Sequence, residues 1–74
     1  NKMKKKFYIE GLTKNMNYLR SRDFSSLQKA VTHAKKLQKK KKIIQAKIWD
    51  NTNRFNQRIA GSLNLSGKFV EGQV

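Results

Sequence analysis

The side chains of this chain that are best suited to chemistry are lysines, and they cluster in one stretch. A run of four occupies residues 39–42, and three more stand shortly before it, at positions 29, 35 and 36. Lysines at this density can neutralise phosphate groups, because each contact releases counterions and adds a salt-dependent increment of affinity. We call the following residues the lysine ridge and predict that they contact phosphates: Lys29, Lys35, Lys36, Lys39, Lys40, Lys41 and Lys42.

The overall charge favours this interpretation over a lysine-rich surface that serves only solubility. The chain of 74 residues has 18 Lys and Arg but only four Asp and Glu, which gives a formal net charge of +14. A net charge of roughly 2 to 8 is enough to keep a small domain in solution. The excess works against compaction, and a polyanion such as nucleic acid is the usual partner of a small domain that tolerates it.

Arginine is distributed differently from lysine, because its residues alternate along predicted strands. Arg20 and Arg22 are two positions apart, and Arg54 and Arg58 are four apart, so we expect each pair on one face of its strand. A guanidinium group donates hydrogen bonds in a fixed fork that suits both phosphates and base edges. The predicted contact face of the sheet consists of Tyr18, Arg20, Arg22, Gln45, Lys47, Trp49, Arg54 and Arg58.

Two roles are open for Trp49, the single tryptophan of the chain. Its ring could stack on a base of the nucleic acid. A lone tryptophan in a small domain more commonly covers the core or the edge of a hairpin, and we favour this structural role for Trp49. For the arginines we favour contact with a ligand, because four arginines on a sheet with few acidic partners cannot all be paired within the protein.

Residues that could support catalysis or bind a metal ion are few. The acidic residues are Glu10, Asp23, Asp50 and Glu71, and none stands at metal-motif spacing from the single histidine, His33. The absence of cysteine excludes disulfides, thiolate catalysis and zinc sites that use cysteine. A nuclease with paired carboxylates would need a motif that the sequence lacks, and there is no glycine-rich phosphate loop. We therefore expect a protein that is not an enzyme and that binds no cofactor or metal.

An amphipathic helix at about residues 25–40 must position most of the lysine ridge. Its apolar side chains fall within one arc at about 100° per residue: Leu27, Ala30, Val31, Ala34 and Leu37. Ser25 and Gln28 have the spacing of a capping box, and Asp23 adds negative charge near the helix start. The lysines lie on the face opposite the apolar arc, and His33 lies at its flank.

After the helix, the apolar period changes to two residues, which indicates a β-hairpin. In residues 43–50, alternate apolar side chains share one face: Ile44, Ala46 and Ile48. Turn residues follow Asp50, and an extended pattern resumes at residues 54–60. We expect Gly61 to end this second strand.

Another hairpin is predicted before the helix, and it is the first in chain order. The extended segments 5–10 and 17–22 flank a loop at residues 11–16. The element order is then ββαββ, and the fold class is α+β, with one amphipathic helix packed on a sheet of three or four antiparallel strands in two layers. We expect this single domain to cover residues 1–61, and residues 62–74 to form a partly ordered tail that could add a short edge strand.

These patterns predict a small, non-catalytic nucleic-acid-binding protein, with DNA favoured over RNA as the partner. In this interpretation the lysine ridge supplies phosphate contacts and the arginine-bearing sheet face supplies orientation. The alternative is an inhibitor or adaptor of the kind that phages and other mobile elements encode, whose basic surface docks on an acidic protein or on a host nucleoprotein machine. Composition alone does not separate the two.

Membrane association is disfavoured on two grounds. No apolar run approaches the roughly 20 residues of a spanning helix, and the narrow, alanine-rich arc of the predicted helix is needed for the core. The basic start of the chain leads into residues 7–10, which include a tyrosine and a glutamate, instead of the apolar core of an export signal. We therefore expect a cytoplasmic protein.

Overall fold

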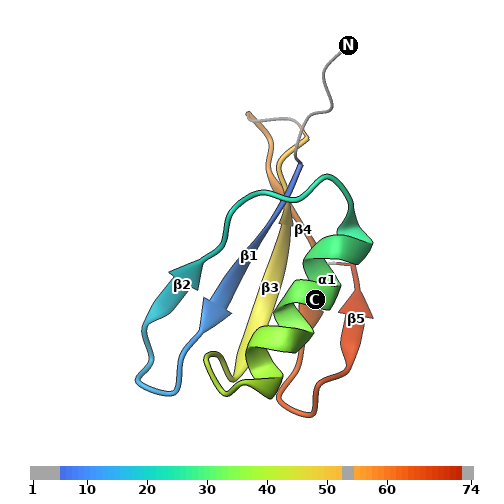
Figure 1. Ribbon diagram of the computed structural model, residues 1–74. Helices are drawn as coiled ribbons and strands as arrows, with labels where there is room; N and C mark the ends of the chain where they lie inside the picture. The colour runs from blue at the N-terminus through green and yellow to red at the C-terminus, as the bar shows by residue number, and fades with distance from the viewer. Residues whose placement is uncertain (1–5, 53–54, 73–74) are drawn as a thin grey trace.

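One helix lies across one face of a five-stranded antiparallel sheet in the computed structural model of the protein (Figure 1). The structure describes residues 6–52 and 55–72. The elements in chain order are β1 (Phe7–Leu12), β2 (Tyr18–Arg20), α1 (Leu27–Lys39), β3 (Gln45–Asp50), β4 (Arg58–Leu63) and β5 (Phe69–Glu71). The strand order across the sheet is β2-β1-β3-β4-β5. The predicted α+β class is confirmed, but the order is ββαβββ and the sheet has five strands where three or four are predicted.

The first hairpin is connected to the helix by a segment that stays paired with β1. Strand β2 ends at Arg20, and the chain then runs beside β1 as far as Phe24, which is buried. The backbone nitrogen of Phe24 donates to the carbonyl oxygen of Phe7 at 2.6 Å, and the nitrogen of Phe7 donates to the carbonyl oxygen of Phe24 at 3.0 Å. This bridge fixes the position from which α1 begins.

Helix α1 begins one residue later than the capping box predicts. Its N-cap is Ser26 and not Ser25, because the Oγ atom of Ser26 accepts a hydrogen bond from the backbone nitrogen of Lys29 at 3.2 Å. Of the predicted apolar arc, Ala30 and Ala34 are fully buried, and the three larger residues are partly buried against the core. The small alanine side chains let the helix approach β1, β3 and β4, the strands against which it packs.

The hydrophobic core lies between α1 and the sheet. Its buried members are Ile9, Phe24, Ala30, Ala34, Ile43, Ala46, Ile48 and Leu63. Ile43 takes the place that the sequence pattern assigns to Ile44, because β3 begins at Gln45 and the preceding residues belong to the connection from α1. Gly11 leaves the space that Ile43 occupies, since a Cβ atom there would lie 2.6 Å from the Cγ2 atom of Ile43.

Gly61 does not end a strand, as the sequence pattern predicts, but lies buried within β4 opposite Ile48. A Cβ atom at this position would clash with the ring of Phe69 and would lie 2.7 Å from the carbonyl oxygen of Val70. A glycine inside a strand often marks such a close approach of a neighbouring element. Gly61 therefore allows β5 to pack at the edge of the sheet, where the predicted optional edge strand is present.

The pairing of β3 with β4 contains a β-bulge, which changes the side on which β4 residues lie. Ile48 pairs with Gly61, whereas Trp49 pairs with Ile59, so one extra residue of β4 stands between them. Strand β4 begins at Arg58 instead of residue 54. Because of the bulge, Ile59 and Arg58 lie on the faces opposite to those that a regular alternation from Gly61 predicts.

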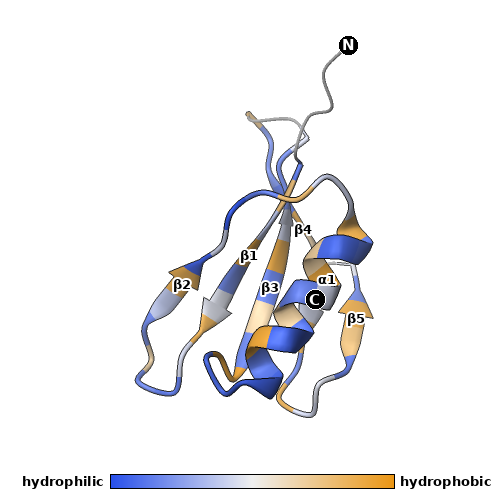
Figure 2. Cartoon of the chain, in the orientation of Figure 1, coloured by the Kyte–Doolittle hydropathy of each residue, from blue (hydrophilic) through white to orange (hydrophobic). Residues whose placement is uncertain are grey.

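The sheet has one face covered by α1 and one that no element of the described residues covers, which we call the open face (Figure 1). Cross-strand neighbours form a row on the open face that includes a residue from every strand: Arg20, Glu10, Lys47, Ser62 and Val70. Hydropathy colouring shows α1 and the loop after it as largely hydrophilic, with hydrophobic residues along β3 and β5 (Figure 2). The molecule thus presents two different surfaces, a helix layer and an open face.

Candidate nucleic-acid interface

The lysine ridge lies on the outer side of α1 and on the loop that follows it. All seven of its lysines are exposed. The chain has no acidic residue between Asp23 and Asp50, so the ridge contains no carboxylate of its own. An uncompensated row of ammonium groups on the outer layer produces a positive potential that attracts a polyanion.

The last three lysines of the ridge are held in place by a Schellman motif at the end of α1. The backbone nitrogen of Lys41 donates to the carbonyl oxygen of Gln38 at 2.9 Å, and that of Lys42 donates to the carbonyl oxygen of Leu37 at 3.0 Å. Lys41 has a φ of 62°, in the left-handed region where glycine is the usual residue. A lysine at this position costs about 1 kcal/mol relative to glycine, and the fold retains it within the most basic segment of the chain.

Gln38 attaches the end of α1 to two other parts of the fold. Its Nε2 atom donates to the carbonyl oxygen of Ile44 and to that of Asn64, both at 2.8 Å. One side chain therefore links the helix, the start of β3 and the turn between β4 and β5. This connection positions the lysine run 39–42, although the sequence pattern indicates only a polar helix residue at Gln38.

A basic hollow of about 480 Å³ lies on the helix layer, between α1 and the segment that precedes it. We define this basic hollow by its lining residues: Arg22, Phe24, Ser26, Gln28, Lys29, Thr32, His33 and Lys36. Two of its cations belong to the lysine ridge, and the third is an arginine that the sequence pattern assigns to the sheet. The hollow brings together cations that are up to 14 positions apart in the chain.

His33 lies in the wall of the basic hollow. Its ring packs against that of Phe24, with 5.1 Å between the centroids. The pKa of the His33 imidazole is lowered from 6.5, first by desolvation and then by repulsion from Arg22, Lys36 and Lys40. A boundary position is what the helix pattern predicts for this residue, and the structure adds that it is surrounded by positive charge.

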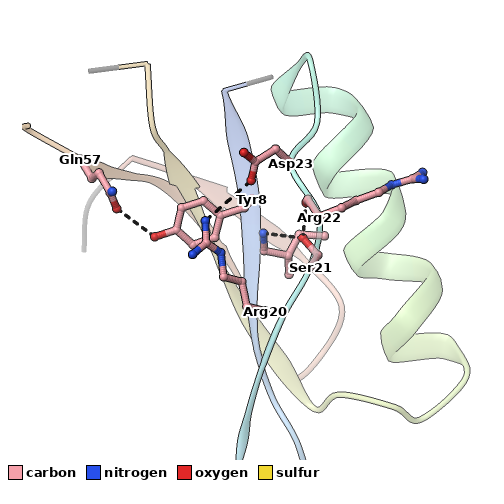
Figure 3. A network of polar contacts seen from close by, with 7 residues as sticks. Tyr8, Arg20, Ser21, Arg22, Asp23 and Gln57 are labelled. Atoms are coloured by element: carbon pink, nitrogen blue, oxygen red, sulfur yellow. Dashed lines mark hydrogen bonds and ion pairs between the residues drawn. The ribbon is translucent and has the colours of Figure 1, made fainter. Parts of the chain in front are cut away.

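On the open face, Arg20 and Tyr8 form a different contact group. The guanidinium carbon of Arg20 lies 4.0 Å from the centroid of the Tyr8 ring, and one of its nitrogens is 3.8 Å from a carboxylate oxygen of Asp23 (Figure 3). The Tyr8 hydroxyl donates to Oε1 of Gln57 at 2.9 Å. Arg20 is therefore partly engaged within the protein, through a cation–π contact and an ion pair.

Trp49 is part of the same group, and its side chain contacts two neighbours within the protein. Its ring is stacked with that of Tyr8, with 6.3 Å between centroids and 12° between planes. Its Nε1 atom donates to Oε1 of Glu10 at 3.2 Å. Trp49 is half-buried, and the stack with Tyr8 occupies one face of its ring.

The structure does not place the predicted sheet arginines on one face. Arg22 points toward α1, with its guanidinium carbon 5.2 Å from the ring of Phe24, while Arg20 lies on the open face (Figure 3). The expected alternation fails because β2 ends at Arg20. Arg58 pairs with Asp50 and so lies on the side opposite Trp49, because the bulge shifts β4. Arg54 lies outside the described residues.

The remaining predicted sheet residues do lie together on the open face. Lys47 stands in the five-residue row, and both Tyr18 and Gln45 are cross-strand neighbours of Leu12 in the next row. Between these rows the face is hollowed by about 420 Å³. Apolar atoms of Leu12, Tyr18 and Val70 contribute to this hollow, which Glu10 and Lys47 also line.

Within residues 6–52 and 55–72, no group of three His, Cys, Asp or Glu side chains could hold a metal ion. The one helix in the described part of the chain is too short and too polar to cross a membrane. Comparison of the chain with protein-family models, with curated proteins and with solved structures gives no match.

Proposed function

We propose that this chain is a non-catalytic nucleic-acid-binding protein whose helix layer contacts the phosphate backbone. The observation that carries the proposal is the lysine ridge, seven exposed lysines on α1 and its following loop without an acidic residue among them. Such a surface binds the phosphates of nucleic acids of any sequence, with an affinity that falls steeply as the salt concentration rises. Arg22, which shares the helix layer, joins this contact surface, whereas Arg20, Lys47 and Trp49 lie on the open face and are not part of it.

The left-handed conformation of Lys41 supports a role for the ridge beyond solubility. Residues that break a local conformational preference tend to occur at functional sites, where another requirement outweighs stability. Glycine at position 41 would satisfy the Schellman motif without strain. A lysine is retained there, between two other lysines, as expected if its charge is needed.

DNA is the favoured partner because of the shape of the contact surface. The exposed half of a 13-residue helix, about 20 Å long, can enter the major groove of B-DNA. The major groove of A-form RNA is deep and too narrow for such an element. The open face supplies no part of this contact, since it lies on the other side of the sheet.

An adaptor function is the second candidate, and the open face favours it. Tyr18 and Val70 are exposed there beside the hollow of about 420 Å³, away from the lysine ridge. Exposed apolar and aromatic side chains around a hollow are typical of protein–protein contact sites. In this function the protein would hold nucleic acid with its helix layer and a second macromolecule with its open face, or dock on an acidic protein with the ridge.

Binding of labelled ligands to the purified protein tests the proposal. Fluorescence anisotropy is measured with four ligands of equal length, namely duplex DNA, duplex RNA and each single strand, at several salt concentrations between about 50 and 200 mM. We expect the tightest binding to duplex DNA, with little dependence on sequence. If none of the four ligands binds at about 50 mM salt, the proposed function is contradicted. An adaptor that docks its lysine ridge on an acidic protein would then remain.

A further inference from the structure

We infer that the basic hollow is a phosphate subsite in which Arg22 supplies a guanidinium fork beside Lys29 and Lys36. The inference rests on the proposed function and identifies where, within the helix layer, one backbone phosphate is held by directed contacts. The rest of the lysine ridge acts by charge alone. Arg22 is therefore the residue at which the protein distinguishes a phosphate from diffuse negative charge.

Arg22 is held over the hollow by a fixed stretch of backbone. The segment before α1 is attached to β1 at both ends, by the hydrogen bond from the nitrogen of Ser21 to the oxygen of Ile9 at 2.9 Å and by the bridge between Phe24 and Phe7. The Ser21 hydroxyl also donates to the carbonyl oxygen of Arg22 at 2.7 Å (Figure 3). The guanidinium carbon lies over the Phe24 ring, 5.2 Å from its centroid, and both residues line the hollow. A pre-positioned fork loses less conformational freedom when it binds an anion.

The charges of the hollow are not balanced within the described part of the chain. The nearest carboxylate in sequence, Asp23, forms its ion pair with Arg20 on the other side of the segment. No ion pair there includes Arg22, Lys29 or Lys36, and the ammonium group of Lys29 has only the hydroxyl of Ser25 as a partner, at 3.3 Å. Three cations around one hollow, without a counter-charge, are complementary to a phosphate group.

His33 is a titratable side chain in the wall of the hollow, close to these cations. Desolvation is the main cause of its lowered pKa, and repulsion from Arg22 of the segment before α1, from Lys36 of α1 and from Lys40 at the helix C-cap adds to it. Beneath the helix, β1 contributes the apolar side chain of Ile9, while the neighbouring Glu10 lies on the open face and bonds to Trp49. An anion in the hollow would offset the repulsion and raise the imidazole pKa.

The test compares two exposed arginines, Arg20 and Arg22, that lie on different surfaces. Arg22→Gln and Arg20→Gln remove the same charge, and Arg22→Lys keeps the charge without the fork. For duplex DNA at fixed salt, we expect Arg22→Gln to weaken binding by about tenfold or more and Arg22→Lys to recover only part of the loss. Arg20→Gln is expected to change affinity by less than about threefold, the effect of one distant charge. Equal losses in the two Gln variants would overturn the subsite and leave the proposed function intact.

A second measurement follows the ring of His33 by NMR during titration with acid, with and without anion. Saturating duplex DNA, or inorganic pyrophosphate as the free-phosphate probe, is expected to raise the pKa of His33 in the wild type and to raise it less in Arg22→Gln. A pKa that neither anion changes would overturn the inference. If the wild type binds no nucleic acid, the proposed function fails, and the pyrophosphate titration still decides whether the hollow binds phosphate.

Discussion

Arg20 and Arg22 are separated by one residue but lie in different layers of the molecule. The guanidinium group of Arg20 covers the ring of Tyr8 at 4.0 Å on the open face, whereas that of Arg22 lies 5.2 Å from the ring of Phe24 on the helix layer. The chain leaves β2 after Arg20 and turns toward α1, so the alternation of a strand no longer applies. Two arginines that look equivalent in the sequence therefore serve two surfaces.

Substitution of Arg20 should affect stability more than binding. Arg20→Ala removes a cation–π contact and an exposed ion pair, each contributing about 0.5–1 kcal/mol or less. We expect a small fall in the urea midpoint and an almost unchanged affinity for DNA. A double-mutant cycle with Tyr8→Leu isolates the ring contact, and full additivity of the two substitutions would show that the contact contributes nothing.

Lys41 should limit stability while contributing to binding. Lys41→Gly relieves the left-handed strain at the end of α1, so we expect the free energy of unfolding to rise by about 1 kcal/mol. The same change removes one phosphate contact and should weaken DNA binding and its salt dependence. Lys42→Gly is the matched control, since it removes an equal charge from a residue whose φ is not positive. Equal stabilities of the two variants in urea would refute the strain argument.

Gly61 should tolerate no side chain. Gly61→Ala forces a methyl group against the Phe69 ring and the carbonyl oxygen of Val70, and overpacking of this kind costs about 1–3 kcal/mol. We expect a lower thermal midpoint and loss of protection from hydrogen exchange in β5 before the rest of the sheet. Ser62→Ala, at the next position on the open face, is the control and should change stability by less than about 0.5 kcal/mol. Similar midpoints for both variants would argue against close packing of β5.

Stability should fall on mild acidification because of His33. Its pKa is lower in the folded protein than the ordinary value of 6.5, so the unfolded chain binds the proton more readily. The free energy of unfolding is therefore highest above the pKa of the unfolded chain. It decreases as the pH falls from that value through the lower pKa of the folded protein. We expect the urea midpoint to decrease between about pH 7.5 and pH 5 and His33→Gln to flatten that decrease. A His33→Gln profile parallel to the wild type would exclude His33 as the cause.

Helix α1 and β3 could be predicted from the sequence because the apolar residues of each follow one period, and the first hairpin because two extended segments flank a loop. Ala30 and Ala34 are central to that pattern and are fully buried. The two adjacent serines at positions 25 and 26 are chemically equivalent caps, and only the backbone geometry selects Ser26. Prediction therefore succeeds for these elements and errs by one or two residues at their ends.

The second half of the sheet could not be predicted, because its determinants are contacts between distant residues. Gly61 looks like a strand end until Phe69 is seen to occupy the space above it. The bulge opposite Trp49, which turns Arg58 away from the open face, leaves no local signal. For the candidate site, the density of lysines identifies the ridge, but the position of Arg22 depends on where β2 ends.

The most direct test of the central claim compares two variants that carry the same reduction in charge. One replaces Lys35, Lys39 and Lys42 of the lysine ridge with Gln, and the other replaces Lys14, Lys47 and Lys68, which are also exposed but belong neither to α1 nor to the loop after it. The affinity for duplex DNA is measured as a function of salt. The ridge variant is predicted to lose about 0.9 units of the log–log salt slope for each phosphate contact removed, and the control to keep nearly the slope of the wild type. Equal slopes and equal affinities in the two variants would contradict a contact surface on the helix layer.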